Sequence, residues 1–132
     1  MSTNYSKALL AGQVINHSAQ ITDLETTTEV DFANIGASGG KYAQIIATST
    51  DTAAKKLQIL IDSKPLGTID IPAGAGTDTT NPAVKILDNS AIYAPIYLEG
   101  GQHLSFKVLA TLTASKAINI TTTEGYDYES LV

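Results

Sequence analysis

Residues 57–73 read LQILIDSKPLGTIDIPA, and the pattern of this stretch decides the fold class. Apolar and polar side chains alternate over two short runs, and the turn sequence DSKP at 62–65 separates them. Alternation with a period of two on both sides of a turn predicts a β-hairpin.

The apolar positions of this hairpin also constrain its turn. These positions are Leu57, Ile59, Ile61, Ile69 and Ile71. If their side chains share one buried face, two residues that lie opposite each other must both have odd numbers or both have even numbers. An unbulged hairpin then requires an odd number of loop residues, most simply Asp62, Ser63 and Lys64. In that register a two-residue loop would turn half of the apolar side chains toward water.

The rest of the chain also reads as short strands. Residues 41–50 are apolar on both faces, which predicts a central strand, and Pro95 favours an edge position or a bulge for the strand that contains it. The sequence PAGAGTDTTNP at 72–82 predicts a long surface loop, and 51–56 a loop or one helical turn. Strands are expected over 29–35, 41–50, 84–88, 92–98, 103–113 and 117–123, with one or two more within 12–24.

About eight or nine short strands without a useful helical segment indicate an all-β, single-domain antiparallel β-sandwich. We favour a jelly-roll-like sandwich because a long crossing loop joins two hairpins. The expected organisation is an N-terminal arm over 1–11, a β-sandwich domain over 12–123 and a C-terminal tail over 124–132. The arm is either a frayed terminus or a segment that docks on a neighbouring subunit. The pattern does not determine the strand order.

Composition excludes several classes of partner and chemistry. The chain of 132 residues has a net charge of −5, with eight lysines and no arginine, so no nucleic-acid partner is expected. It has no cysteine and therefore neither a disulfide framework nor a Cys-based metal or redox site. No signal peptide and no run of membrane-spanning length is evident, so we expect synthesis in a cytoplasm and no membrane partner.

Catalytic and metal motifs are weak. The sequence GASGGKY at 36–42 has the wrong spacing for a phosphate-binding loop, and a tyrosine stands where that loop needs Ser or Thr. His17 and His103 have no acid at metal-ligand spacing, so a strand-end or surface role is expected for both. No G-x-S-x-G elbow is present, although a triad assembled in space stays open.

Acidic residues are expected to be solvated. Glu29 and Asp31 share one strand face, and a hard-cation site at Asp78 or Asp88 lacks the dense spacing of a calcium loop. We therefore predict no catalytic residue, no metal, no cofactor and no enzymatic activity.

Tyrosines supply most of the aromatic surface, because the chain has six Tyr, two Phe and no Trp. Tyr93 and Tyr97 project from one strand face, where they either contact a partner or pack under the loop 73–82. Tyr126 and Tyr128 stand in a short polar tail and are expected to pack against something. The candidate protein-contact residues are Tyr5, Leu9 and Leu10 of the arm, with Tyr93, Tyr97, Tyr126 and Tyr128.

Two stretches resemble small structural proteins of tailed bacteriophages. Residues 60–83 contain an apolar strand, a turn, LGTIDIPA and a loop rich in Gly, Thr, Asn and Pro. Residues 96–128 contain IYLEGGQHLSFKV and a last strand that ends near YDY. The two stretches make up about half of the chain, and residues 1–24 have no clear counterpart.

The resemblance implies a non-enzymatic virion protein, a capsid decoration (cement) protein with a jelly-roll-like fold. Such a protein binds and stabilises the outer surface of the assembled head, so the implied partner is the major capsid protein. The resemblance also implies a homo-oligomer, with a trimer favoured, and a place on the capsid surface after synthesis in the host cytoplasm.

Other functions stay open beside this one. A carbohydrate-binding or adhesion module of the virion surface would use Tyr93 or Tyr97 as a stacking platform, although Trp is absent. A tail or fibre-base component would share the same fold class. An enzyme is the least supported, since two histidines and scattered acids do not define a site.

Overall fold

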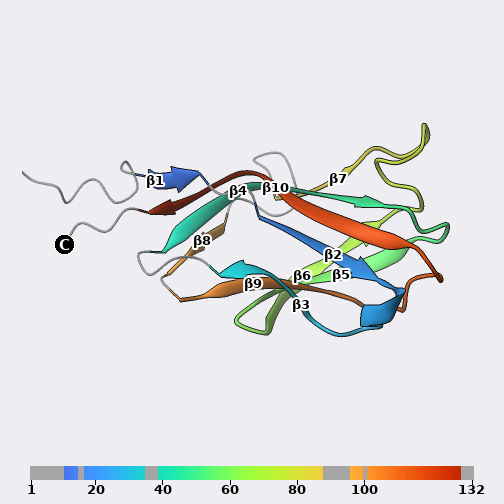
Figure 1. Ribbon diagram of the computed structural model, residues 1–132, viewed down its shortest axis with the longest axis horizontal. Helices are drawn as coiled ribbons and strands as arrows, with labels where there is room; N and C mark the ends of the chain where they lie inside the picture. Colours follow the sequence, from blue (N-terminus) through green and yellow to red (C-terminus); the bar gives the residue numbers. More distant parts are fainter. Residues whose placement is uncertain (1–10, 15–16, 35–38, 88–95, 100, 129–132) are drawn as a thin grey trace, which may run out of the picture.

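The computed structural model describes residues 11–14, 17–34, 39–87, 96–99 and 101–128 (Figure 1). This part of the chain forms ten strands and one 3₁₀ turn, Asp23–Glu25. No helix in these ranges has the length and apolar character needed to cross a membrane. Tyr5, Leu9, Leu10 and Tyr93, which were predicted contact residues, lie outside the described residues.

The first sheet is built around two long antiparallel strands, β10 and β4. β1 and β2 pair in turn with the two ends of β10, while β8 and β7 pair with the two ends of β4. The six strands are β1 (Ala11–Val14), β2 (Ser18–Thr22), β4 (Gly40–Ser49), β7 (Val84–Leu87), β8 (Ile96–Leu98) and β10 (Ala117–Tyr128).

The second sheet has four antiparallel strands in the order β3-β9-β5-β6. Its strands are β3 (Val30–Asn34), β5 (Lys55–Ile61), β6 (Lys64–Ile71) and β9 (His103–Val108). The two sheets lie face to face as the layers of a sandwich (Figure 1).

The topology is that of a jelly roll. Because β1 and β2 share one edge of their sheet and β7 and β8 the other, each sheet is four strand positions wide. The chain crosses from one sheet to the other at every connection except three: the β5–β6 hairpin, and the connections β1–β2 and β7–β8, whose strands share an edge position. The expected antiparallel, jelly-roll-like sandwich is therefore confirmed, with ten strands in eight positions.

The inward faces of both sheets form one apolar core. Three aromatic rings pack together inside it. The centroid of the Phe32 ring lies 5.3 Å from that of Tyr42 and 5.6 Å from that of Phe106, both in edge-to-face geometry. The hairpin side chains predicted to face the core do so at Leu57, Ile59, Ile69 and Ile71. The expected central strand 41–50 corresponds to β4, which has neighbours on both sides.

The turn of the β5–β6 hairpin differs from the prediction of three loop residues. Ile61 pairs with Lys64, so the loop contains only Asp62 and Ser63, whose φ angles are 50° and 64°. Positive φ at both positions is the two-residue turn that suits twisted strands. A bulge at Leu66 restores the core-facing register, and the Leu66 side chain stays 46% exposed.

The last two strands also end at other places than predicted. β9 stops at Val108 instead of running to 113. The N–H of Leu109 still donates to the carbonyl of Lys56 at 3.0 Å, in the register of the β5–β9 pair, and the strand pairing ends there. β10 continues past 123 to Tyr128, since its second half pairs with both β4 and β1. Residues 124–128, expected in a tail, are therefore part of the first sheet.

Candidate binding surface

An exposed tyrosine stands on the outer face of the first sheet. In β8, Ile96 and Leu98 are buried while Tyr97 between them is 63% exposed, as the alternation predicted. Tyr97 pairs with Lys41 of β4, and the Lys41 Nζ lies 5.4 Å from the centroid of the tyrosine ring. This cation–π contact is worth about 0.5–1 kcal/mol at an exposed site and limits the positions of the ring.

The strand register extends this pair into a row across three strands. Tyr126 of β10 is the antiparallel partner of Lys41 on the side opposite Tyr97. Two strand spacings separate the backbones of the two tyrosines, which is about 10 Å. Two predicted contact residues that lie far apart in the sequence thus belong to one row. Tyr128 pairs with Ala11 of β1, farther along β10.

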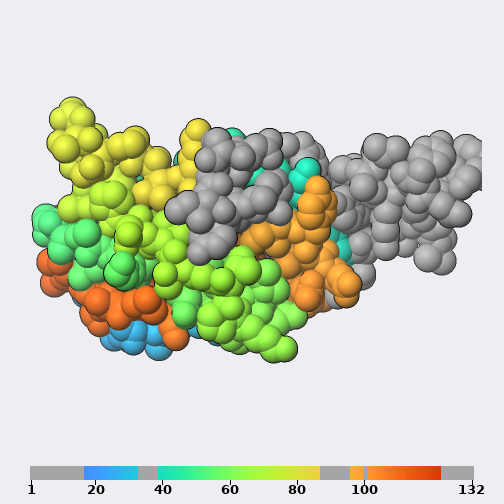
Figure 2. Space-filling view, turned by 180° about the vertical axis from the view of Figure 1, so that it is seen from behind, coloured from blue at the N-terminus to red at the C-terminus, as the bar shows by residue number. Residues whose placement is uncertain are grey.

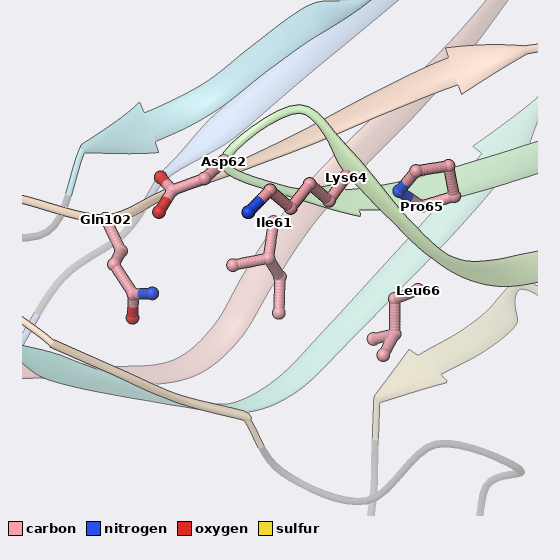
Figure 3. A pocket seen from close by; sticks show the side chains of 6 residues that line it. All are labelled: Ile61, Asp62, Lys64, Pro65, Leu66 and Gln102. Atoms are coloured by element: carbon pink, nitrogen blue, oxygen red, sulfur yellow. The ribbon is translucent and has the colours of Figure 1, made fainter.

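A shallow pocket of about 290 Å³ lies at the turn of the β5–β6 hairpin (Figure 3). Asp62, Lys64 and Gln102 give it charged and amide groups, while Ile61, Pro65 and Leu66 give it apolar surface. In the space-filling view, the hairpin in light green borders the segment around Gln102 in orange (Figure 2). The mixture of donors, acceptors and apolar surface suits a small polar group of a ligand.

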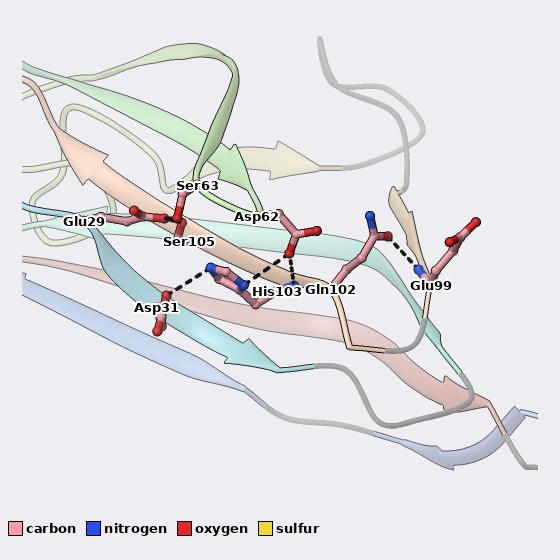
Figure 4. A network of polar contacts seen from close by, with 8 residues as sticks. All are labelled: Glu29, Asp31, Asp62, Ser63, Glu99, Gln102, His103 and Ser105. Atoms are coloured by element: carbon pink, nitrogen blue, oxygen red, sulfur yellow. Dashed lines mark hydrogen bonds and ion pairs between the residues drawn. The ribbon is translucent and has the colours of Figure 1, made fainter.

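A polar network lies beside this pocket and includes His103 (Figure 4). The ring Nδ1 is 3.2 Å from Oδ1 of Asp62, and the ring Nε2 is 3.6 Å from Oδ1 of Asp31. His103 opens β9, at the expected strand end, and the fold brings it close to two acids that the sequence spacing did not reveal. Glu29 and Asp31 are both exposed, as expected, and Glu29 Oε1 also accepts hydrogen bonds from the hydroxyls of Ser63 and Ser105.

The network does not have the geometry of a Ser-His-Asp triad. Both ring nitrogens of His103 face carboxylates, whereas a triad needs one of them to face the nucleophile. The two nearby serine hydroxyls donate to Glu29 instead. The other histidine, His17, is half-buried, and its Nδ1 lies 2.5 Å from the hydroxyl of Tyr42, which is a packing role.

The carboxylate of Asp78, which lacks the sequence spacing of a calcium loop, accepts hydrogen bonds from the backbone. Its Oδ1 accepts the backbone N–H groups of Thr80 at 2.9 Å and Asn81 at 3.0 Å. The hydrogen bond from Asn81, followed by that from Thr80, lowers the pKa of Asp78. The carboxylate therefore shapes the 72–82 loop. Asp88 lies outside the described residues.

Comparison with known proteins yields similar folds only. No family model and no curated protein sequence matches the chain. A family 35 carbohydrate-binding module from Clostridium thermocellum is similar over 84% of this chain and 93% of its own, with 17% identity and a TM-score of 0.42. The CBM36-1 domain of a xylanase from the hindgut metagenome of Trinervitermes trinervoides is similar over 92% and 77%, with 10% identity and a TM-score of 0.36.

A third structure illustrates how partial such likenesses are. The family 43 arabinoxylan arabinofuranohydrolase of Bacillus subtilis is similar over 89% of this chain but only 25% of its own, with 18% identity and a TM-score of 0.36. At TM-scores below 0.5, these likenesses assign neither a ligand nor an activity to this chain.

Proposed function

We propose that this protein is a non-catalytic binding module that docks through the outer face of β4 and β8. The observation that carries the proposal is the Tyr97 ring, which is 63% exposed yet restrained by Lys41. Tyrosine buries a large area at low entropic cost and keeps a hydrogen-bonding tip, so it is a frequent anchor of interfaces. The backbone of Tyr126 pairs with Lys41 on the side opposite Tyr97.

The first candidate partner is the shell of a phage head, with the chain acting as a capsid decoration protein. The support is the sequence resemblance of residues 60–83 and 96–128, together with the jelly-roll topology that this resemblance implies. The partner is the major capsid protein, the site of action is the virion surface, and the assembly is a homo-oligomer, with a trimer favoured. Binding only to the assembled lattice stabilises it by RT ln(1 + [L]/Kd).

The second candidate partner is a carbohydrate. The specific observation in its favour is again the exposed ring of Tyr97, because a tyrosine face beside a donor such as the Lys41 ammonium can stack on a sugar and bond its hydroxyls. Carbohydrate-binding modules are also among the structures with a similar backbone trace. This likeness suggests carbohydrate as a partner to test and does not identify the ligand.

One pair of binding measurements separates the candidates. The full-length protein is tested on a glycan array. It is also tested in co-sedimentation with empty shells assembled from the major capsid protein that is encoded in the same genome as this chain. Tyr97→Ala should weaken binding to the true partner at least about tenfold, as expected for an aromatic anchor. Leu24→Ala is the matched control, because Leu24 is also exposed but lies in the 3₁₀ turn.

The two binding measurements either identify the partner or reject the proposed docking surface. Binding to shells alone identifies the decoration protein, and binding to glycans alone identifies the carbohydrate module. If the protein binds either partner but Tyr97→Ala and Leu24→Ala behave like the wild type, the docking surface is elsewhere. If neither partner is bound, both candidates are rejected.

A further inference from the structure

We propose that Glu29, Asp31 and His103 form a binding site for a divalent transition-metal ion such as Zn²⁺. One donor atom from each of these residues lies within 4.8 Å of the other two. Glu29 immediately precedes β3, Asp31 is on β3 and His103 opens the neighbouring strand β9, so strand pairing brings the three together (Figure 4). The site is separate from the Tyr97 surface, and it stands or falls independently of the proposed function.

The contacts of His103 distinguish its two ring nitrogens. Oδ1 of Asp62 accepts the backbone N–H of His103 at 3.1 Å and lies 3.2 Å from Nδ1. With Nδ1 facing Asp62, Nε2 is the ring nitrogen on the side of Asp31, and it would bind the ion through its lone pair. A carboxylate that holds the distant nitrogen of a histidine in this way is the usual support of a metal-binding imidazole.

The second ring nitrogen faces further acceptors. Nε2 lies 3.6 Å from Oδ1 of Asp31. A metal ion at this position would be bound by the imidazole on one side and by the carboxylate on the other. Among the described residues, no lysine forms an ion pair with Glu29, Asp31 or Asp62.

The donor set selects the class of metal. One imidazole and two carboxylates suit Zn²⁺ and related transition metals, whereas Ca²⁺ and Mg²⁺ prefer oxygen ligands alone. Donor atoms around a tetrahedral Zn²⁺ at its usual bond lengths lie about 3.4 Å apart, so the side chains must close slightly. Asp31 can do so because its side chain is 70% exposed.

Glu29 is already oriented for this role. Its Oε1 accepts hydrogen bonds from Ser63 on the hairpin turn and from the buried Ser105 on β9. Three protein ligands leave at least one coordination position open to water or to a group of a docked partner.

The test is titration of the purified full-length protein with ZnCl₂ after treatment with a chelator. Isothermal calorimetry should detect one site per chain, and Zn²⁺ should raise the unfolding temperature as a ligand of the native state. His103→Gln and Asp31→Asn should each weaken binding at least about tenfold. Asp70→Asn, which removes an exposed carboxylate of β6, should bind like the wild type.

The sequence makes the result unambiguous. The chain has no cysteine and only two histidines, so His17→Gln tests the only other imidazole. If His103→Gln does not fold, Asp31→Asn carries the test, because Asp31 is an exposed side chain. The proposal is overturned if the wild type binds no Zn²⁺ up to about 1 mM, or if Asp31→Asn and His103→Gln bind as tightly as the wild type.

Discussion

The carboxylate of Asp51 accepts two hydrogen bonds from Thr113, a residue 62 positions away in the sequence. One comes from the backbone N–H at 2.9 Å and one from the hydroxyl at 2.8 Å, and a third comes from the N–H of Ala53 at 2.9 Å. The backbone carbonyl of Asp51 also accepts the N–H of Gly74. This buried aspartate therefore joins three loops at one end of the sandwich.

Asp51→Asn should lower the free energy of unfolding by about 1–3 kcal/mol, because the amide NH₂ cannot accept and one donor of Thr113 or Ala53 then loses its partner at the buried side chain of residue 51. Urea unfolding of both proteins measures the difference. Asp70→Asn is the control, since its ion pair with Lys56 is exposed and worth at most about 1 kcal/mol. Equal losses for the two variants would contradict the role given to Asp51.

The contribution of Asp51 should depend on pH in a defined direction. Burial acts to raise the pKa of Asp51, but the hydrogen bonds from Thr113 and Ala53 and the charge of Lys55 together lower it below 3.8. A carboxylate with a lowered folded-state pKa stabilises the protein above its unfolded-state pKa and loses that effect as the pH falls through the folded value. The stability difference between wild type and Asp51→Asn should therefore be full near neutral pH and shrink below about pH 4.

Gly74→Ala should destabilise the protein more than Gly101→Ala. Both glycines have positive φ, 65° and 87°, so each substitution incurs a backbone cost of about 1–2 kcal/mol. An added Cβ at Gly74 would also lie 2.2 Å from Oδ2 of Asp78, while at Gly101 no described atom lies within 4 Å. The difference between the melting temperatures of the two variants measures the steric cost, because the backbone cost is similar in both. Equal melting temperatures would contradict the steric cost and show that the Asp78 side chain moves away from the new Cβ.

Alternation predicted the strands and core well, and long-range contacts poorly. Leu104, Phe106 and Val108 face the core as expected, because side-chain direction in a strand follows from local sequence. The equal-parity register of the hairpin holds at Leu57 and Ile69, but the two-residue turn was missed because a bulge at Leu66 has no signature in the alternation. The meeting of His103 with Asp62, 41 positions apart, depends on the strand order, which the pattern did not provide.

The placement of Tyr126 was missed for a related reason. The sequence EGYDYESLV is short, polar and acidic, which is typical of a tail. Pairing with β4 on one side and β1 on the other satisfies the backbone hydrogen bonds of 124–128, so the segment forms strand despite its composition. Tertiary pairing outweighed local propensity here.

Ser63→Gly should stabilise the hairpin by about 0.5–1 kcal/mol, because Ser63 has a φ of 64° that glycine adopts without strain. The substitution also removes the exposed hydrogen bond from Ser63 Oγ to Glu29 at 3.1 Å, which reduces the gain slightly. Ser63→Ala is the matched control, since it loses the same hydrogen bond but keeps the Cβ. Urea unfolding should rank the proteins with Ser63→Gly above the wild type and Ser63→Ala at or below it.

Phe106→Ala should be the most damaging of these substitutions, with a loss of about 3–5 kcal/mol. Phe106 is fully buried on β9, pairs with Ile59 of β5 and meets the ring of Phe32, so its removal leaves a cavity where the two sheets meet. Leu109→Ala is the control three residues farther along, because β9 has ended and Leu109 is 42% exposed. We expect its free energy of unfolding, measured in urea, to stay within about 0.5 kcal/mol of that of the wild type. A large loss at Leu109 would mean that β9 continues into the core past Val108, which would contradict the strand end and the loop that leads to Thr113.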